Sequence, residues 1–380
     1  MSDIKGPSDL EKEVLKQKLC VACGACMGLC AYFGTFQGKV VMLDSCKLIQ
    51  GRCYAFCPRT TTDMEKLRLE FFDKRDFLPE IGPFRGLYIT RASDKSIRTK
   101  SQHGGSTTAL VELAMKEGLI DSAIMTCSNG GLNPSGMLVS KPEEVRRCSG
   151  SSFQIPPSLM ILNQALKENK YKKIGVIGTP CKTLAAYKTR SKPFAENDHH
   201  ADNIAMVFGL FCGWGLDWVG LEKVIEGKTP PEKVKHIDVL PSKYQILEVK
   251  TRNGRIEVPL DEIYPIVRES CRYCTDMTAE FSDISIGGAR SSKGWDFDRG
   301  WNQVIVRTRK GEELLKIARE KRILEFREIE SENFDKLKKA SRNKKKNATQ
   351  NILKKTGNGN NLLYLDPEDP GLKGLLHSAI

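Results

Sequence analysis

Four cysteines near the start of the chain have the spacing of an iron–sulfur binding loop. Cys20, Cys23, Cys26 and Cys30 follow the pattern C-x2-C-x2-C-x3-C. Three thiolates on one tight loop can bind three irons of a cubane, while the fourth cysteine points to a neighbouring cluster. A zinc ribbon, the alternative, uses two C-x2-C pairs about 15 to 20 residues apart, which suits this spacing poorly. Ala31 replaces the proline that usually follows the fourth cysteine, but that proline is not a ligand.

A second, less regular group follows in C-x6-C-x3-C-P, formed by Cys46, Cys53 and Cys57. A full repeat would place cysteines at 47 and 50, which are Lys47 and Gln50. In two-cluster ferredoxins the last cysteine of each group binds the other cluster. On that rule the first cluster takes Cys20, Cys23, Cys26 and Cys57, and the second takes Cys30, Cys46 and Cys53, one ligand short. The second is then a three-iron cluster or a cubane with a non-cysteine fourth ligand. The remaining alternative is that there is no second cluster and Cys46 binds no metal.

The remaining six cysteines are scattered. Cys127 and Cys148 stand alone, so we expect each to be a small buried residue. The other four are Cys181 in GTPCKT, Cys212 in LFCGWG, and Cys271 and Cys274 in CRYC. Four cysteines on three turns have the right number for a further cubane, which their spacing alone leaves open.

The cellular compartment bears on how these thiols are used. The chain starts MSDIKGPSDLEKEV, which is charged and lacks the apolar core of a secretory signal. The longest apolar stretch, 204–216, is too short to span a membrane. We therefore expect a cytoplasmic protein without a transmembrane segment, whose thirteen cysteines are not a disulfide framework.

The elements that must position these residues follow from periodicity. Residues 13–57 are too cramped for a hydrophobic core of their own, so metal would hold them together. Residues 58–85 are typical of a helix followed by a linker. From 86 to about 310 strand-like and helix-like runs alternate (GLYITRA, TTALVELAMKEGLI, DSAIMTC, SLMILNQALKEN, KKIGVIGTP), which predicts an α/β domain. Residues 235–260 instead predict antiparallel strands around the Asn253–Gly254 turn.

The positive charge is concentrated near the end of the chain. The net charge is +13, and the stretch from Lys336 to Lys355 carries nine Lys or Arg and no acidic residue. This pattern is typical of a solvated helical or floppy tail; the alternatives are a docking surface for an acidic partner and a nucleic-acid site. No aromatic residues interleave with the basic ones, so we expect no nucleic-acid binding.

Five strings, taken together and in order, resemble the beta-subunit family of coenzyme F420-reducing hydrogenases and dehydrogenases. They are HGGSTTALVELAMKEGLID at 103–121, GTPCKTLAA at 178–186, LFCGWG at 210–215, CRYCTDMTAEFSDISIGG at 271–288 and the GW…VIVRTRKGEEL stretch ending at 314. The resemblance covers about 86 to 315. It implies a mixed-sheet α/β flavin domain preceded by a small ferredoxin-like iron–sulfur domain. We expect the boundaries 1–62 for the ferredoxin-like domain, 63–85 for a linker helix, 86–330 for the FAD and 4Fe-4S domain, and 331–380 for a basic tail.

The resemblance also implies cofactor sites. One 4Fe-4S cluster would be bound by Cys181, Cys212, Cys271 and Cys274, making two or three 4Fe-4S clusters in all, with 3Fe-4S as the alternative for the one near Cys30, Cys46 and Cys53. FAD would contact the turn formed by His103, Gly104, Gly105, Ser106, Thr107 and Thr108. Glycines let the backbone approach closely, and a capped helix start favours a pyrophosphate. No G-x-G-x-x-G or G-x-x-x-x-G-K-[ST] occurs, so a Rossmann or P-loop site is unsupported.

Several other residues have two alternative roles near the predicted flavin site. Lys182, Arg290 and Lys293 could meet the anionic groups of a deazaflavin, or simply be surface charges. His103 could contact flavin or substrate, or be a packing residue. Asp283, Gly287 and Gly288 are expected to shape a turn beside the cofactor.

The function implied is that of an oxidoreductase subunit. A flavin takes a hydride as two electrons and passes them singly to iron–sulfur centres. The hydride carrier would be coenzyme F420, with NAD or a quinone left open. The partner would be a hydrogenase, a formate dehydrogenase, a heterodisulfide-reductase-like protein or ferredoxin. Two alternatives remain: a ferredoxin-dependent reductase of an organic substrate, and an electron-transfer scaffold without a hydride substrate.

Overall fold

The computed structural model describes residues 4–73, 77–128, 132–194, 199–240, 244–290, 294–357 and 359–376. Its strands are β1 (Phe33–Phe36), β2 (Lys39–Met42), β3 (Phe77–Leu78), β4 (Gly82–Pro83), β5 (Gly86–Ala92), β6 (Ser122–Ser128), β7 (Pro134–Val139), β8 (Ile174–Gly178), β9 (Ile204–Leu210), β10 (Val234–Val239), β11 (Ile246–Thr251), β12 (Gly254–Pro259), β13 (Ile284–Gly288), β14 (Asn302–Val306) and β15 (Leu324–Arg327).

The longer helices connect and cover these strands. The α-helices are α1 (Pro7–Leu10), α2 (Arg52–Ala55), α3 (Met64–Phe71), α4 (Lys95–Lys100), α5 (Ser106–Lys116), α6 (Leu159–Glu168), α7 (Pro180–Arg190), α8 (Trp218–Glu226), α9 (Leu260–Ile263), α10 (Glu269–Arg272), α11 (Trp295–Gly300), α12 (Arg309–Glu320), α13 (Ser331–Thr356) and α14 (Lys373–Leu376). Short turns of other helix types are η1 (Glu11–Leu15), η2 (Pro142–Cys148), η3 (Ala201–Asn203), η4 (Pro231–Lys233) and η6 (Tyr264–Ile266).

An eight-stranded mixed sheet organises the molecule, in the order β15-β5-β14-β13-β9-β8-β6-β7. The four middle strands β13, β9, β8 and β6 are parallel to one another. The flanking pairs are antiparallel. The predicted α/β alternation is therefore confirmed, and the antiparallel edge strands make the sheet mixed. Parallel strands need crossover helices, which is why the apolar helical runs alternate with the strands in the sequence.

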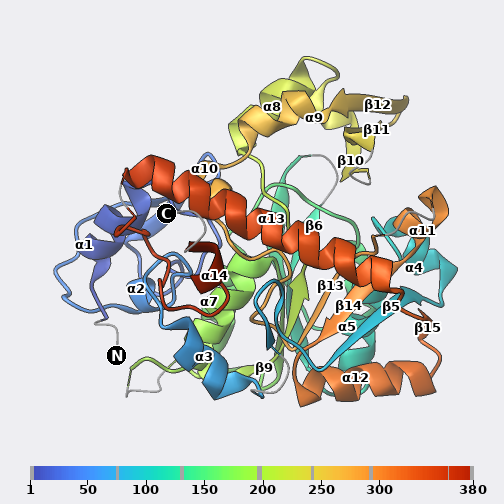
Figure 1. Cartoon of the computed structure of the whole chain (residues 1–380), viewed down its shortest axis with the longest axis horizontal. Helices are drawn as coiled ribbons and strands as arrows, with labels where there is room; N and C mark the ends of the chain where they lie inside the picture. Colours follow the sequence, from blue (N-terminus) through green and yellow to red (C-terminus); the bar gives the residue numbers. More distant parts are fainter. Residues whose placement is uncertain are drawn as a thin grey trace.

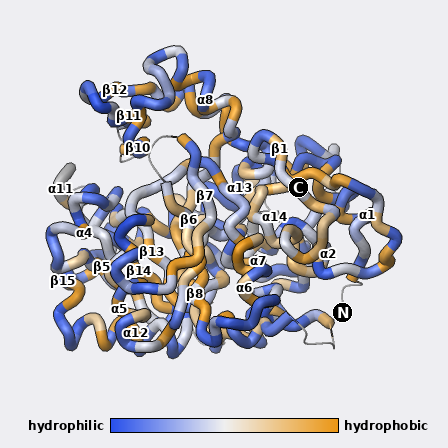
Figure 2. Tube along the Cα trace, turned by 180° about the vertical axis from the view of Figure 1, so that it is seen from behind, coloured by the Kyte–Doolittle hydropathy of each residue, from blue (hydrophilic) through white to orange (hydrophobic). Residues whose placement is uncertain are grey.

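Helices cover both faces of the sheet (Figure 1). On one face α5 and α12 bury side chains such as Leu110 and Leu314 in a shared core. On the other face α6 and α7 pack with α3 around Leu162, Tyr187 and Phe281. Figure 2 shows β6 and β8 as hydrophobic strands in the interior, as expected for strands buried on both faces.

A small antiparallel sheet, β10-β11-β12, stands apart from the main sheet with α8 and α9 against it (Figure 1, top). Its core contains Leu221, Val249 and Ile263, all fully buried. The hairpin between β11 and β12 turns at Arg252 and Asn253, and Gly254 pairs with Thr251. This arrangement confirms the antiparallel strands predicted for residues 235–260.

The N-terminal cysteine-rich segment has little regular structure beyond the β1–β2 hairpin and short helices. Its apolar side chains, such as Leu10 and Val14, share a core with residues from the far end of the chain, Ile352, Leu365 and Leu372. The C-terminal region therefore provides much of the covering of this segment, which is too small to bury enough apolar surface alone.

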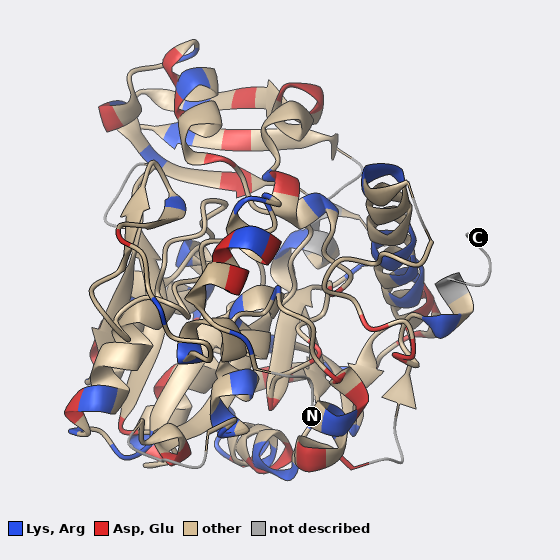
Figure 3. Cartoon of the chain, turned by 90° about the vertical axis from the view of Figure 1, so that its left-hand side faces the viewer, with Lys and Arg blue, Asp and Glu red and all other residues tan. Residues whose placement is uncertain are grey.

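The basic segment is not a free tail, which corrects the simplest interpretation of its charge. It forms α13, a 26-residue helix that crosses the molecule (Figure 1), with Leu337, Lys345 and Ile352 buried. Figure 3 shows many Lys and Arg positions, coloured blue, along the ribbon of this helix at the right-hand side of the view. Lys345 donates to Glu280 at 2.6 Å between two buried side chains. Part of the positive charge is therefore neutralised inside the protein.

No helix in the described part of the chain is long and apolar enough to cross a membrane.

Candidate functional site

A cavity of about 1000 Å³ lies at the carboxyl ends of the four parallel strands. Its wall contains the last residues of each strand or those that follow, Ser128 at the end of β6, Thr179 after β8, Phe211 after β9 and Gly288 at the end of β13. In open α/β sheets ligands bind in the crevice at this edge, where crossovers leave the strand ends uncovered. The topology therefore brings separate segments of the chain to one site.

The predicted cofactor-binding turn forms one side of this cavity. His103, Gly105, Ser106, Thr107 and Thr108 line it. Gly105 has a φ of +79° and directly precedes α5, and an added Cβ would be 2.8 Å from Ile97 Cγ2, so the turn requires glycine. The first N–H groups of α5 have no acceptor within the helix.

Gly104 stands behind the cavity wall rather than on it. A Cβ added there would be 2.9 Å from both the Arg91 Cβ and Asn302 Oδ1. Asn302, which the sequence did not single out, also accepts a hydrogen bond from Ser106 N at 3.0 Å and donates to Gly287 O at 3.1 Å. One amide side chain thus joins the turn to the end of β13.

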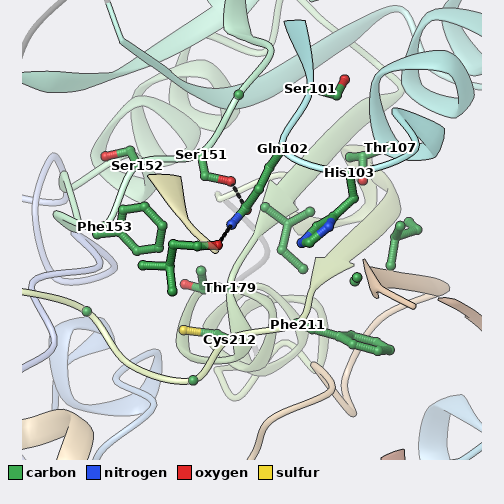
Figure 4. Close-up of a pocket in the computed structure, with 18 of the residues that line it drawn as sticks. Ser101, Gln102, His103, Thr107, Ser151, Ser152, Phe153, Thr179, Phe211 and Cys212 are labelled. Atoms are coloured by element: carbon green, nitrogen blue, oxygen red, sulfur yellow. Dashed lines mark hydrogen bonds between the residues drawn. The ribbon is translucent and has the colours of Figure 1, made fainter. Parts of the chain in front are cut away.

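The two glycines of DISIGG do not form the expected turn. They end strand β13, and their missing side chains make room for aromatic rings: a Cβ on Gly287 would be 2.1 Å from Phe211 Cδ2, and one on Gly288 would be 2.7 Å from His103 Cε1. Figure 4 shows the His103 and Phe211 rings on this side of the cavity. Asp283 lies before the strand, away from the cavity, where it accepts from Val207 N and Thr308 Oγ1.

The charged side chains on the cavity wall are cationic. Lys182, Arg290, Lys336 and Lys339 line it, and the described residues of the wall include no Asp or Glu. Lys182 is 3% exposed and donates to Thr126 Oγ1 at 3.0 Å, and burial lowers its pKa to about 8. The site therefore suits an anionic ligand. Lys293 lies outside the described residues.

One group of thiols, called the third thiol group below, adjoins the cavity. Cys181 is in the first turn of α7, and Cys212 follows β9 and also lines the cavity. Cys271 is in α10, and Cys274 lies two residues after the end of that helix. Burial raises the pKa of Cys212; the nearby Lys344 lowers it, but repulsion from the other three thiols adds to the rise. Cys271 Sγ accepts a hydrogen bond from Gly215 N at 3.3 Å. The structure thus brings together the four cysteines that the family resemblance implied as cluster ligands.

Two cations face the third thiol group. Arg59 is 4% exposed, and Lys344 of α13 donates to the carbonyl oxygens of Cys212 and Gly213, both at 2.7 Å. Burial alone would raise the pKa of Cys274, but Lys344 and Arg59 outweigh it and hold that pKa below its ordinary value. The surroundings therefore favour a thiolate at Cys274, the form that binds metal.

The N-terminal thiols form two further groups. Cys26 is electrostatically coupled to Cys20, Cys23 and Cys57, and burial raises its pKa well above the ordinary value. Burial also raises the pKa of Cys53 to about 12, with a further contribution from Cys30 and Cys46. We call Cys20, Cys23, Cys26 and Cys57 the first thiol group and Cys30, Cys46 and Cys53 the second, after the ferredoxin rule; because Cys53 also interacts with Cys26 and Cys57, the division between the two groups stays a prediction.

The loop that carries the first group is tightly wound. Ala22, Gly24 and Gly28 have φ values of 57°, 88° and 74°, and Ala22 N donates to Cys20 Sγ at 3.4 Å. Among the described side chains no three of His, Cys, Asp or Glu are arranged to hold a single metal ion.

The three thiol groups are linked in series. Cys23 of the first group is electrostatically coupled to Cys181 of the third. Cys26 of the first group is coupled to Cys53 of the second. Cys30 of the second group is exposed. The first thiol group therefore lies near both the third thiol group, which adjoins the cavity, and the second, whose Cys30 is exposed.

Cys127 and Cys148 are not two isolated buried residues, as expected from the sequence, but a disulfide. The expectation failed because 21 residues separate them in the chain, and only the fold brings the end of η2 against β6. Sequence reasoning also missed Lys336, Lys339 and Lys344 as site residues. Their charge was visible, but no local pattern places α13 over the cavity.

Comparisons with known proteins identify a family that matches most of the chain. Two family models of the coenzyme F420 hydrogenase/dehydrogenase beta subunit match the chain: the N-terminal model at residues 87–163 and the C-terminal model at residues 171–332. The beta subunit of the coenzyme F420 hydrogenase of Methanothermobacter thermautotrophicus is 28% identical over 277 residues, which are 72% of this chain and 95% of that protein.

Two further similarities extend this result. A subunit of the F(420)H(2) dehydrogenase of Methanosarcina mazei is 27% identical, with 81% of this chain and 84% of that protein covered. A chain in a solved structure of the F420-reducing NiFe hydrogenase complex from Methanosarcina barkeri superposes with a TM-score of 0.66 at 26% identity, covering 74% of this chain and 96% of that one.

Proposed function

Because the chain belongs to the coenzyme F420 hydrogenase/dehydrogenase beta-subunit family, it is an oxidoreductase, and we propose that it transfers electrons between coenzyme F420 and a partner redox subunit. The observation that carries this proposal is the cavity, which has four cations and no carboxylate on its described wall and shares Cys212 with the third thiol group.

The residues of the cavity fit FAD. The N–H groups of Thr107 and Thr108 at the start of α5, together with the positive end of the helix dipole, can bind a pyrophosphate. Lys182 and Arg290 add positive charge to the same wall. Bound there, FAD would accept a hydride as two electrons and release them one at a time. The chain itself contributes the anion-binding wall and, by burying Lys182, a charge that water screens weakly.

The three thiol groups supply the onward route. We assign 4Fe-4S clusters to Cys181, Cys212, Cys271 and Cys274, and to Cys20, Cys23, Cys26 and Cys57. A further cluster, 4Fe-4S or 3Fe-4S, is assigned to Cys30, Cys46 and Cys53. The couplings Cys181–Cys23 and Cys26–Cys53 support this order.

Electrons would reach the partner at the second group. Cys30 is exposed, and the segment directly after it, residues 31–49, contains five of the eight large hydrophobic side chains exposed in the described part of the chain: Tyr32, Phe36, Leu43, Leu48 and Ile49. Ile49 is 87% exposed. Exposed apolar side chains beside a redox group are typical of a docking surface. We propose that an iron–sulfur electron-transfer subunit binds this surface, which comprises residues 30–49.

The test is anaerobic reduction of the purified full-length chain by reduced coenzyme F420, with NADH in parallel. Bleaching of the flavin followed by cluster reduction, with the deazaflavin only, is the expected result. Iron analysis should give about 8 to 12 irons per chain with one flavin. Bleaching by neither donor but reduction by ferredoxin would move the function to a ferredoxin-fed reductase. If the cofactors are bound but no turnover occurs, the chain is an electron-transfer scaffold without a hydride substrate of its own.

A control variant distinguishes the effect of a cation that contacts the substrate from the effect of the overall charge of the protein. Lys339→Gln removes a cation from the cavity wall, whereas Lys346→Gln removes an exposed one that does not line it. We expect the first to raise the KM for coenzyme F420 several-fold and the second to leave it unchanged. Equal effects would mean that the wall cations do not contact the substrate.

A further inference from the structure

The Cys127–Cys148 disulfide lies in the wall of the cavity. Cys127 is near the carboxyl end of β6 and Cys148 ends η2, with Cα atoms 4.2 Å apart. Cys148 lines the cavity, as do Thr126 and Ser128 on either side of Cys127. Both cysteines are buried, at 2% and 8% exposure. A small molecule in the cavity can therefore approach the pair, whereas a protein thiol in solvent cannot.

The bond fastens the start of a segment that forms much of the cavity wall. Residues 149–156 all line the cavity. Ser149 Oγ is 3.2 Å from Thr108 Oγ1 in α5, and Ser151 Oγ donates to Gln102 Oε1, a contact visible in Figure 4. Further along, Phe153 O accepts from Leu216 N at 2.7 Å, which ties the segment to the chain entering the small β10–β12 lobe.

Two groups that could accept electrons in different ways thus face one cavity. The third thiol group reaches it through Cys212, which follows β9. The disulfide reaches it from β6, and only β8 lies between β6 and β9 in the sheet. Since neighbouring strands are about 4.8 Å apart, the two are on the order of 10 Å from each other. An iron–sulfur cluster takes one electron at a time, whereas a disulfide takes two.

We propose that Cys127–Cys148 is a second redox site of the cavity, a disulfide that is reduced by the dihydroflavin formed there. The S–S bond breaks and two S–H bonds form. The dihydroflavin supplies both electrons and both protons and returns to the oxidised flavin. This inference rests on the proposed function for its reductant. Its consequence is that reduction releases residues 149–156 from β6, so the state of the bond reports whether electrons have accumulated in the cavity.

The experiment maps thiols on the full-length protein under anaerobic conditions. The protein is treated with one, two or more equivalents of reduced coenzyme F420, unfolded in excess iodoacetamide and analysed as peptides by mass spectrometry. The expected result is that the Cys127 and Cys148 peptides are unmodified in the oxidised protein and both alkylated after reduction. The wild type should also consume one more hydride equivalent per chain than Cys127→Ala/Cys148→Ala.

Two results would overturn the proposal: both cysteines already alkylated in the protein with oxidised flavin, or a disulfide that persists after the flavin has been fully bleached. The peptide readout needs no variant, so a double variant that fails to fold leaves the test intact. If reduced coenzyme F420 does not bleach the flavin, the proposed function fails; photoreduction of the bound flavin with 5-deazariboflavin then tests the disulfide separately.

Discussion

Neutralising Lys344 should lower the reduction potential of the cluster proposed at the third thiol group. The Lys344 ammonium donates to Cys212 O and Gly213 O at 2.7 Å and lies on the opposite side of α13 from the exposed Lys346. Reduction adds one negative charge to a cluster, which a nearby cation stabilises. The variant Lys344→Gln removes that stabilisation.

The size of the effect follows from Coulomb's law. For a separation of roughly 7 to 10 Å and an effective dielectric constant of about 20, one unit charge contributes about 1.7 to 2.4 kcal/mol. That corresponds to roughly 70 to 100 mV for a one-electron couple. Because Lys344 is only half-buried, water screens part of this, and we expect a fall of roughly 50 to 100 mV.

The assay is an anaerobic redox titration followed by electron paramagnetic resonance. Lys344→Arg keeps the charge and should restore most of the potential, which separates charge from the loss of the two hydrogen bonds. Lys346→Gln should shift the potential by less than about 20 mV, because solvent screens an exposed charge. A wild-type potential in Lys344→Gln, or an equal shift in Lys346→Gln, would refute the reasoning.

Four other changes test the remaining parts. Gly105→Ala should destabilise the fold by about 1 to 2 kcal/mol in chemical unfolding and reduce flavin content, because φ is +79° and Ile97 blocks a Cβ. Ile49→Glu should weaken electron exchange with the partner at least several-fold without changing iron content, whereas Leu69→Glu, exposed on α3, should not. Ile352→Ala, at a fully buried site, should cost about 2 to 5 kcal/mol and release iron at lower temperature. Burial raises the pKa of Asp238 to about 6, so the folded chain keeps this proton at pH values where the unfolded chain has lost it. Raising the pH from 5 to 7 should therefore lower the free energy of unfolding of the wild type by roughly 1 kcal/mol more than that of Asp238→Asn.

Local patterns were enough to predict some elements of the two sheets, but β7, β14 and β15 were not predicted and β13 was expected to be a turn. The strand at 86–92, the helix opening at Ser106 and the hairpin at Asn253 each depend on side chains close together in sequence, and all are confirmed. The family was recognised from motifs that the chain keeps in order, and the matched models confirm it. Which thiols bind which cluster remains a prediction.

Contacts between distant segments could not be predicted in the same way. Nothing near Cys127 indicates that Cys148 will lie against it. The lysine run of α13 suggested a solvated segment because charge is usually exposed, yet Lys345 is buried against Glu280. Gly287 and Gly288 suggested a turn because glycine favours turns, whereas here the glycines admit Phe211 and His103 beside a strand. Each of these errors concerns a residue whose surroundings come from elsewhere in the chain.

The shared core of the two chain ends also has a consequence for synthesis. Leu10 and Val14 emerge from the ribosome more than 300 residues before Ile352, Leu365 and Leu372, which cover them. The apolar side chains of the cysteine-rich segment therefore stay partly exposed while the α/β domain is synthesised and folds. We expect its iron to be inserted after translation is complete, and truncation at residue 350 to leave a folded sheet whose first two thiol groups fail to retain iron.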